Sequence, residues 1–183
     1  NLQMMHMVAK DNVKFLTTLE RHFKNLANGS MITIVETLPS LMNAIRMVWI
    51  ISRYFNTDGY MEPLMKRIAD QICDKVEEQI NVNQIFSMEP TKAMAIITDG
   101  RNALEKWNEV YLTTRAKIEE SATDHRWEFD KLTLFKKSWY MTKICKELYE
   151  IAQVLDQFYK FLGPELKEVT GDSQGIEALM KEV

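Results

Sequence analysis

Residues 97–118 read ITDGRNALEKWNEVYLTTRAKI and carry an unbroken periodic pattern. Apolar or small side chains recur there at steps of three and four residues: Ile97, Gly100, Leu104, Trp107, Tyr111, Thr114 and Ile118. Residues at this spacing share one face of an α-helix, which has about 3.6 residues per turn. The pattern therefore predicts a helix from about Thr91 to Glu120 with one continuous buried face.

A second long helix is predicted from about Leu132 to Leu162. Its apolar stripe repeats at the same steps and consists of Met141, Ile144, Leu148, Ile151, Leu155, Phe158 and Leu162. Only a short connection with a polar break at residues 121–124 separates the two helices, which favours antiparallel packing at a shallow angle. At about 1.5 Å per residue, each helix spans roughly 40 Å. We expect an elongated helical bundle that forms part of a rod-like tandem array. In it, residues 91–183 provide this antiparallel pair and the start of a following helix near Ile176.

Residues 1–90 are predicted to form an N-terminal helical unit. Helices are expected at about residues 8–27, 31–55 and from the turn at 56–59 to residue 80, followed by a connector over 81–90. Trp49 widens the apolar face of the second of these helices. No run alternates between apolar and polar residues over enough length to predict a strand. The sequence therefore predicts an all-α fold.

Composition narrows the function classes. Apolar residues make up 46% and charged residues 27% of the 183 residues, so the chain is expected to bury a core. A net charge of −3 argues against a nucleic-acid binder. The most apolar run, Met47 to Ile51, is far shorter than the about 20 residues of a membrane span. It is flanked by Arg46 and Arg53, so we expect a buried helix and no membrane contact.

The sequence offers little that could perform chemistry. It contains neither the G-x-x-x-x-G-K-[ST] phosphate loop nor G-x-G-x-x-G. The three histidines, His6, His22 and His125, lack metal-ligand spacing. Cys73 and Cys145 are expected to be buried free thiols in a reducing compartment. We therefore expect no catalytic residue, no cofactor-binding residue, no metal site and no bound cofactor in this segment.

The connector before the second long helix is the most distinctive local motif. Trp127 and Phe129 alternate there with the charged residues Arg126, Glu128 and Asp130. We expect the two aromatic rings to point inward and join the long helices, because each can bury about 150–250 Å². The alternative is a docking hot spot for a partner chain. An active site is disfavoured because no nucleophile accompanies the adjoining Asp124 and His125.

Six residues are the structural or interaction candidates that the sequence singles out: Trp49, Trp107, Trp127, Phe129, Leu148 and Leu155. Leu148 and Leu155 are expected in the core. A cluster of N-terminal methionines is a further candidate for contact with another segment or chain, if it is exposed: Met4, Met5 and Met7.

Several long strings resemble the N-terminal tail of axonemal dynein heavy chains. They are KDNVKFL at 10–16 with LERHF at 19–23, PSLMNA at 39–44 with RMVWIISR at 46–53, and NTD at 56–58. The resemblance continues in RAKIE at 115–119, RWEFD at 126–130 and GPELKEVTGD at 163–172. It covers nearly the whole chain from Lys10 onward and leaves the first nine residues unmatched. The sequence departs from the usual pattern of this family at Gly59–Tyr60 and over residues 130–133. Both places are loops or helix starts. Details of the pattern lean toward an outer-arm, gamma-type chain.

The resemblance implies a function that the residues alone do not. The parent would be a minus-end-directed microtubule motor with ATP and Mg²⁺ bound in AAA+ modules elsewhere in the chain. This segment would be a non-catalytic scaffold that supports assembly with intermediate and light chains and with other heavy chains. It would help to anchor the arm to the doublet microtubule of a ciliary or flagellar axoneme. The competing interpretations are an unrelated cytoskeletal helical-bundle adaptor and a helical enzyme or ligand carrier.

Overall fold

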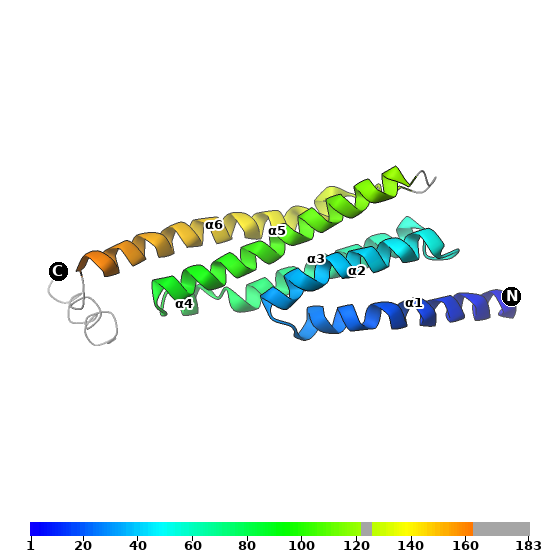
Figure 1. Ribbon diagram of the computed structural model, residues 1–183, viewed down its shortest axis with the longest axis horizontal. Helices are drawn as coiled ribbons and strands as arrows, with labels where there is room; N and C mark the ends of the chain where they lie inside the picture. The colour runs from blue at the N-terminus through cyan, green and yellow to red at the C-terminus, as the bar shows by residue number, and fades with distance from the viewer. Residues whose placement is uncertain (122–125, 163–183) are drawn as a thin grey trace.

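The chain forms an elongated bundle of helices in the computed structural model, which describes residues 1–121 and 126–162 (Figure 1). The helices of the described residues are α1 (Leu2–Asn28), α2 (Met31–Ile51), α3 (Asp58–Gln79), α4 (Val82–Ile85), α5 (Pro90–Glu120) and α6 (Lys131–Leu162). Consecutive long helices reverse direction, with the short α4 placed between α3 and α5. The described residues contain no strand, so the all-α prediction is confirmed.

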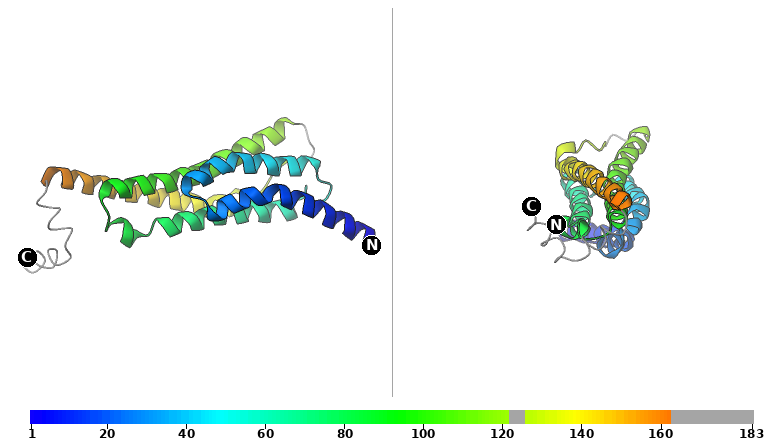
Figure 2. Two further views of the ribbon diagram at one scale, coloured as in Figure 1. Left: turned by 60° about the horizontal axis from the view of Figure 1, so that its bottom comes forward. Right: turned by 90° about the vertical axis from the view of Figure 1, so that its left-hand side faces the viewer.

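The two predicted long helices are present and lie side by side. α5 packs against α6, α2 and α3, and α2 packs against α1. The end-on view in Figure 2 shows the helices gathered around a common interior. One hydrophobic cluster contains residues from all six helices, on both sides of residue 90. The division of the chain into units 1–90 and 91–183 stays a prediction.

The helix boundaries differ from the predicted ones where side chains compete for backbone groups. α2 ends at Ile51 rather than near Phe55. The Ser52 hydroxyl oxygen accepts hydrogen bonds from the backbone N–H groups of Tyr54 (3.2 Å) and Phe55 (3.0 Å). These donors are thereby satisfied outside a helix. α2 runs through Pro39 without a break.

The turn between α1 and α2 depends on a glycine for space. Gly29 has φ −77° and ψ 161°, an extended backbone conformation. A Cβ atom there would lie 2.4 Å from the Asn25 carbonyl oxygen and 2.8 Å from the Thr33 side chain. Ser30 is the N-cap of α2, because its hydroxyl accepts a hydrogen bond from the Thr33 N–H at 3.2 Å.

α2 is long and apolar enough to cross a membrane by length and composition, with a mean hydropathy of 1.3. It is also a bundle helix, packed against α1 and α5. Buried side chains include Leu38, Leu41, Met42 and Ile45, none of which is exposed. Packing within the bundle accounts for the apolar composition of this helix.

The predicted buried face of α5 is confirmed at all seven positions from Ile97 to Ile118. The predicted stripe of α6 is confirmed only in its first part, where Leu148 is buried and Met141 and Ile144 are partly buried against the core. The buried residues of α6 are Leu134, Phe135, Ser138, Cys145, Leu148, Ala152 and Asp156. Leu155 is only partly buried, whereas Ile151 is 49%, Phe158 55% and Leu162 45% exposed. The side of α6 that packs against α5 is rotated away from the most apolar stripe, and α6 runs past the start of α5 (Figure 1).

We expect Leu148→Ala and Leu155→Ala to differ in their effect on the free energy of unfolding. Leu148 is buried, so its truncation should cost roughly 2–5 kcal/mol. Leu155 already contacts water, so its truncation should cost less than about 1 kcal/mol. Urea unfolding of the two variants measures both values. Equal losses at the two positions would show that α6 is packed on both sides.

Candidate functional site: an aromatic joint and an apolar groove

Rings from three helices and one connector meet at one end of the α5–α6 pair. We call this cluster the aromatic joint; it consists of Trp49, Trp107, Tyr111, Trp127, Phe129 and Phe135. Trp49 comes from α2, Trp107 and Tyr111 from α5, and Phe135 from α6. The remaining two rings come from the connector before α6.

Trp127 is the ring that links the connector to two helices. Its side chain is fully buried, at 0% exposure. It stacks on Tyr111 with ring centroids 5.8 Å apart and meets Trp49 edge-on at 6.2 Å. Phe129 also lies 6.2 Å from Trp49 and is buried. Arg126, Glu128 and Asp130 are exposed, so the predicted inward and outward alternation of this segment is confirmed.

Phe135 carries the aromatic contacts from the connector into α6. Its ring centroid lies 4.9 Å from that of Tyr111 and 6.0 Å from that of Trp107, both on α5. Trp139 stacks on Phe135 at 5.6 Å and donates its Nε1–H to the Asn108 side-chain oxygen at 3.1 Å. Pairs of this kind are each worth about 0.5–1.5 kcal/mol beyond area burial. The rings therefore fix the start of α6 against α5.

The polar atoms of the joint are poorly suited to proton transfer. Trp107 Nε1, the Tyr111 hydroxyl and Trp127 Nε1 are buried and have no hydrogen-bond partner among the described residues. Burial raises the pKa of Tyr111 to about 12, against a smaller opposing effect of the nearby Arg115. The phenol is therefore neutral at physiological pH. The arrangement supplies packing rather than an acid–base pair.

Asp130 begins α6 immediately after the joint. Its carboxylate oxygens accept hydrogen bonds from the Leu132 N–H (3.1 Å), the Thr133 N–H (3.3 Å) and the Thr133 hydroxyl (2.6 Å). These are N-cap interactions, which satisfy donors that the first helical turn leaves unpaired. The hydrogen bond from Thr133 is the main reason that the pKa of Asp130 lies below its ordinary value.

A second feature is an apolar groove between the end of α3 and the middle of α6. We call it the α3–α6 groove; its volume is about 300 Å³. It is lined by Val76, Glu77, Ile80, Val82, Lys137, Tyr140, Met141, Ile144, Cys145 and Leu148. Only Glu77 and Lys137 bring charge to it, so the groove suits an apolar occupant with one polar end.

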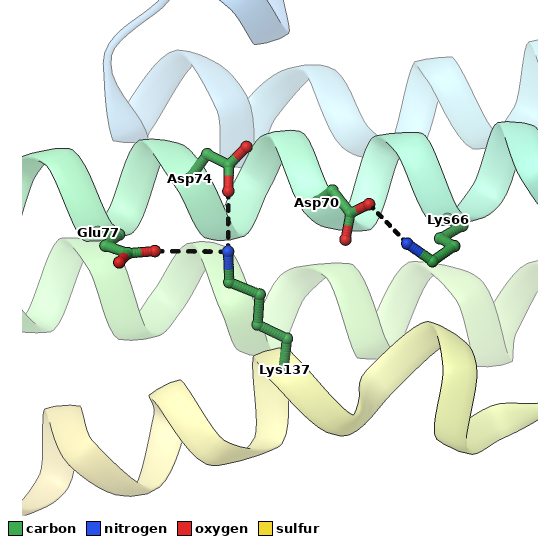
Figure 3. Close-up of polar contacts among 5 residues, drawn as sticks. All are labelled: Lys66, Asp70, Asp74, Glu77 and Lys137. Carbon is green, nitrogen blue, oxygen red and sulfur yellow. Dashed lines mark hydrogen bonds and ion pairs between the residues drawn. The ribbon is translucent and has the colours of Figure 1, made fainter.

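Lys137, which lines the groove, forms ion pairs that cross from α6 to α3 (Figure 3). Its ammonium nitrogen lies 2.8 Å from an Asp74 oxygen and 3.4 Å from a Glu77 oxygen, both on α3. The hydrogen bond to Asp74 is the main cause of the raised pKa of Lys137. All three side chains are about half exposed or more, so the pairs contribute little stability. The Lys66–Asp70 pair, at 3.0 Å, lies within α3.

Both cysteines are buried free thiols, as predicted. Burial raises the pKa of Cys73 to about 11 and also raises the pKa of Cys145. Both thiols are therefore protonated and unreactive at neutral pH. No group of three metal-ligating side chains gathers within residues 1–121 and 126–162. His125 lies outside the described residues, and His6 and His22 lie well apart along α1.

The structure brings four of the six sequence candidates to the joint: Trp49, Trp107, Trp127 and Phe129. Leu148 lies at the groove, and Leu155 lies beyond it on the uncovered side of α6, which corrects its expected place in the core. Sequence reasoning missed Phe135 as a joint residue and missed the Lys137–Asp74 pair. Phe135 lay outside the predicted stripe, and 63 residues separate the ion-pair partners, so no local pattern could indicate either.

Comparison with known proteins gives matches over the full chain. A family model described as dynein heavy chain, N-terminal region 1, matches residues 1–183, including the first nine residues. The dynein-1-alpha heavy chain of the flagellar inner arm I1 complex of Chlamydomonas reinhardtii is 49% identical over 96% of this chain. Human dynein axonemal heavy chain 10 is 46% identical over 96% of it. The chain spans about 4% of the length of each of these relatives.

The expected lean toward an outer-arm gamma chain is not supported. The gamma chain of the Chlamydomonas reinhardtii flagellar outer arm is 26% identical over 82% of this chain. That identity is about half of the value for the inner-arm I1 alpha chain.

Trp127→Ala should lower the free energy of unfolding by about 3–5 kcal/mol, because a fully buried ring and its contacts to α2 and α5 are removed. Phe161→Ala is the matched control, since this ring is 89% exposed. Urea unfolding of both variants measures the difference. An unchanged urea midpoint for Trp127→Ala would contradict the structural role of Trp127 in the aromatic joint.

Asp130→Ala should lower the melting temperature at neutral pH, and Asp130→Asn should lower it less because an amide oxygen also caps a helix. The folded-state pKa of Asp130 is depressed, so its charge stabilises the fold above the ordinary aspartate pKa of about 3.9. That contribution is lost as the pH falls through the lower folded-state pKa. The difference in melting temperature between the wild type and Asp130→Asn should therefore disappear over this pH range. A gap that persists at the lowest pH would exclude a charge effect.

Proposed function

Because the chain belongs to the dynein heavy chain family and matches its N-terminal region, we propose that it is a non-catalytic scaffold segment of an axonemal dynein heavy chain. The match over residues 1–183 carries this proposal. Because the chain belongs to this family, we reject the alternative of an unrelated cytoskeletal adaptor. The segment acts by holding a fixed shape, and its contacts with other chains lie on its outer surface.

The interior of the bundle supports a structural role. The joint and the core of α5 are filled by apolar and aromatic side chains, and the titratable groups buried there are neutral at physiological pH. A rigid helical unit of this kind transmits force and position, because close-packed interiors have low compressibility. The hydrolysis of ATP, with its Mg²⁺, belongs to the motor region of the parent chain, outside this segment.

The partners of the segment are those of an axonemal arm. We infer assembly with intermediate and light chains and with other heavy chains, and anchoring of a minus-end-directed motor to the doublet microtubule through docking factors. The segment then works in the axoneme of a cilium or flagellum, as part of the cytoskeleton. The names of the relatives support this location, since they are flagellar and axonemal heavy chains.

The test separates scaffolding from catalysis in a full-length heavy chain. Residues 1–183 are replaced by an unrelated helical bundle of similar length. We expect copurification of the intermediate chains to be lost while the ATPase activity of the heavy chain is retained. In parallel, calorimetry on the isolated chain with Mg-ATP should give no saturable binding.

Two results would overturn the proposal. One is loss of ATPase activity with assembly intact. The other is saturable ATP binding by the isolated chain.

A further inference from the structure

A second groove lies between the first half of α1 and the end of α2. We call it the α1–α2 groove; its volume is about 400 Å³. On α1 its lining comes from neighbouring positions on three successive turns, residues 6–7, 10–11 and 14–15. The end of α2 and the residues just after it supply the opposite wall. Figures 1 and 2 show the start of α1 and the end of α2 at one end of the bundle, and the end of α6 at the other.

Three cationic side chains line this groove without a partner. Lys10, Lys14 and Arg53 form no ion pair with any residue in 1–121 or 126–162. Lys10 and Lys14 stand four residues apart on α1, a spacing at which like charges repel each other. The Lys14 ammonium lies 5.9 Å from the centre of the Phe15 ring, a cation–π contact that leaves its charge uncompensated. The groove therefore gathers positive charge that the bundle does not neutralise.

The acids near the groove do not cancel this charge. Asp11 is the only acid among the described residues that line it, and no ion pair joins Asp11 to the three cations. Glu20, the next acid along α1, is paired with Lys24 at 2.8 Å. Asp58, in the first turn of α3, is the first acid after Arg53 in the chain and does not line the groove.

The balance stays positive even when Asp58 is counted, because three cations then face two acids. Besides burial, the charge of Glu62 raises the pKa of Tyr111 on α5, so Glu62 lies toward α5. His6, which also lines the groove, can only add positive charge. This end of α1 is therefore basic in a chain whose net charge is −3.

The rest of the lining is apolar and aromatic. Met7 and Ile51 are 50% and 57% exposed, and Phe15 and Tyr54 are half-buried beside them. Phe15 also meets Phe55 edge-on, with ring centroids 6.3 Å apart, which ties α1 to the connection after α2. A ligand in this groove would meet apolar surface and unpaired cations together.

We propose that the α1–α2 groove binds an acidic peptide segment of another chain. Its carboxylates would pair with Lys10, Lys14 and Arg53, since cations without partners favour anions and an arginine can hold a carboxylate through two hydrogen bonds. One apolar side chain of the peptide would pack on Met7 and Ile51. A peptide is favoured over a lone anion because the groove is large and much of its lining is apolar.

The chain's own acidic stretch is not the occupant that we propose. Residues 163–183 contain five acids and two lysines, but they follow α6 at the end of the bundle opposite the groove (Figure 1). The proposal deepens the scaffold function by giving a partner contact a place and a chemistry. It rests on that function only for the identity of the natural partner.

The test uses the full 183-residue chain and a fluorescent peptide as the probe. The peptide has about ten residues, enough in extended form to follow residues 6–15 of α1, and is rich in glutamate around one leucine. A second peptide carries glutamines in place of the glutamates. Fluorescence anisotropy at low salt should show the glutamate peptide binding at least about ten-fold more tightly. The difference should shrink between about 0.01 M and about 0.15 M salt, because the screening length falls from about 30 Å to about 8 Å.

Charge variants of the chain locate the binding. The double variant Lys10→Glu/Lys14→Glu should weaken binding of the glutamate peptide at least about ten-fold. Arg21→Glu/Lys136→Glu is the control, because it changes the net charge equally at exposed positions outside the groove. Arg53→Gln removes one cation from the opposite wall without adding an acid, and it should also weaken binding. Circular dichroism confirms that each variant remains helical.

The apolar contact has its own matched pair of variants. Ile51→Ser should weaken binding of the glutamate peptide, because it removes an exposed apolar side chain from the groove. Ile32→Ser is the control: Ile32 is 61% exposed on the same helix but lies outside the groove. Equal binding by these two variants would reject the apolar part of the site.

Four outcomes would overturn the proposal. Equal binding of the two peptides, or an equal loss in the control double variant, would reduce the effect to net charge or reject it. Peptide binding that appears only after deletion of residues 163–183 would assign the groove to the chain's own residues. Tighter binding to phosphatidylserine vesicles, abolished by Lys10→Glu/Lys14→Glu, would make the partner a lipid surface. None of these results affects the copurification test, so failure of this site and failure of the scaffold function are distinguishable.

Discussion

α5 packs against three other helices at once, and the arrangement of the bundle follows from how its surface meets them. Toward its start, small residues allow close approach. A Cβ atom on Gly100 would lie 2.7 Å from the end of the Ile80 side chain and 3.2 Å from the Val76 side chain, so a larger residue would require these side chains to move. Further along, Trp107 and Tyr111 pack against Phe135 of α6. The surface of α5 therefore meets one neighbour with a small residue and another with large rings.

The aromatic joint lies where the chain reverses direction between α5 and α6. After α5, the chain must reverse and begin α6 beside it, and Trp127 fills the space that the reversal opens between α2 and α5. The N-cap at Asp130 then starts α6 directly after the buried rings. Because Phe135 packs on Tyr111 and Trp107, the rotation of α6 about its own axis is fixed from its first turns. That rotation determines which side of α6 the core receives.

The same rotation leaves the rest of α6 available for function. If α6 had turned its most apolar stripe toward α5, the bundle would have buried it and the groove would not exist. The core instead takes a less apolar side that includes Ser138 and Asp156, and Ile151, Phe158 and Leu162 remain exposed. The fold thus combines a filled interior with apolar side chains that are exposed along the second half of α6.

The sequence by itself determined the long helices of the described residues, the buried face of α5, the inward rings of Trp127 and Phe129, and the family. The short α4 lies in what was predicted as a connector. These features are local: a period of three and four residues, or an alternation of aromatic and charged residues, is set by backbone geometry and side-chain type. Tertiary structure alone decided the buried side of α6, the place of Leu155, the role of Phe135 and the pairing of Lys137 with Asp74. Hydrophobic periodicity says that a side of a helix avoids water, but not which surface covers it. That choice depends on the shape of neighbours that are distant in sequence. Which side of α6 is buried could therefore be read only from the packing of α6 against α5.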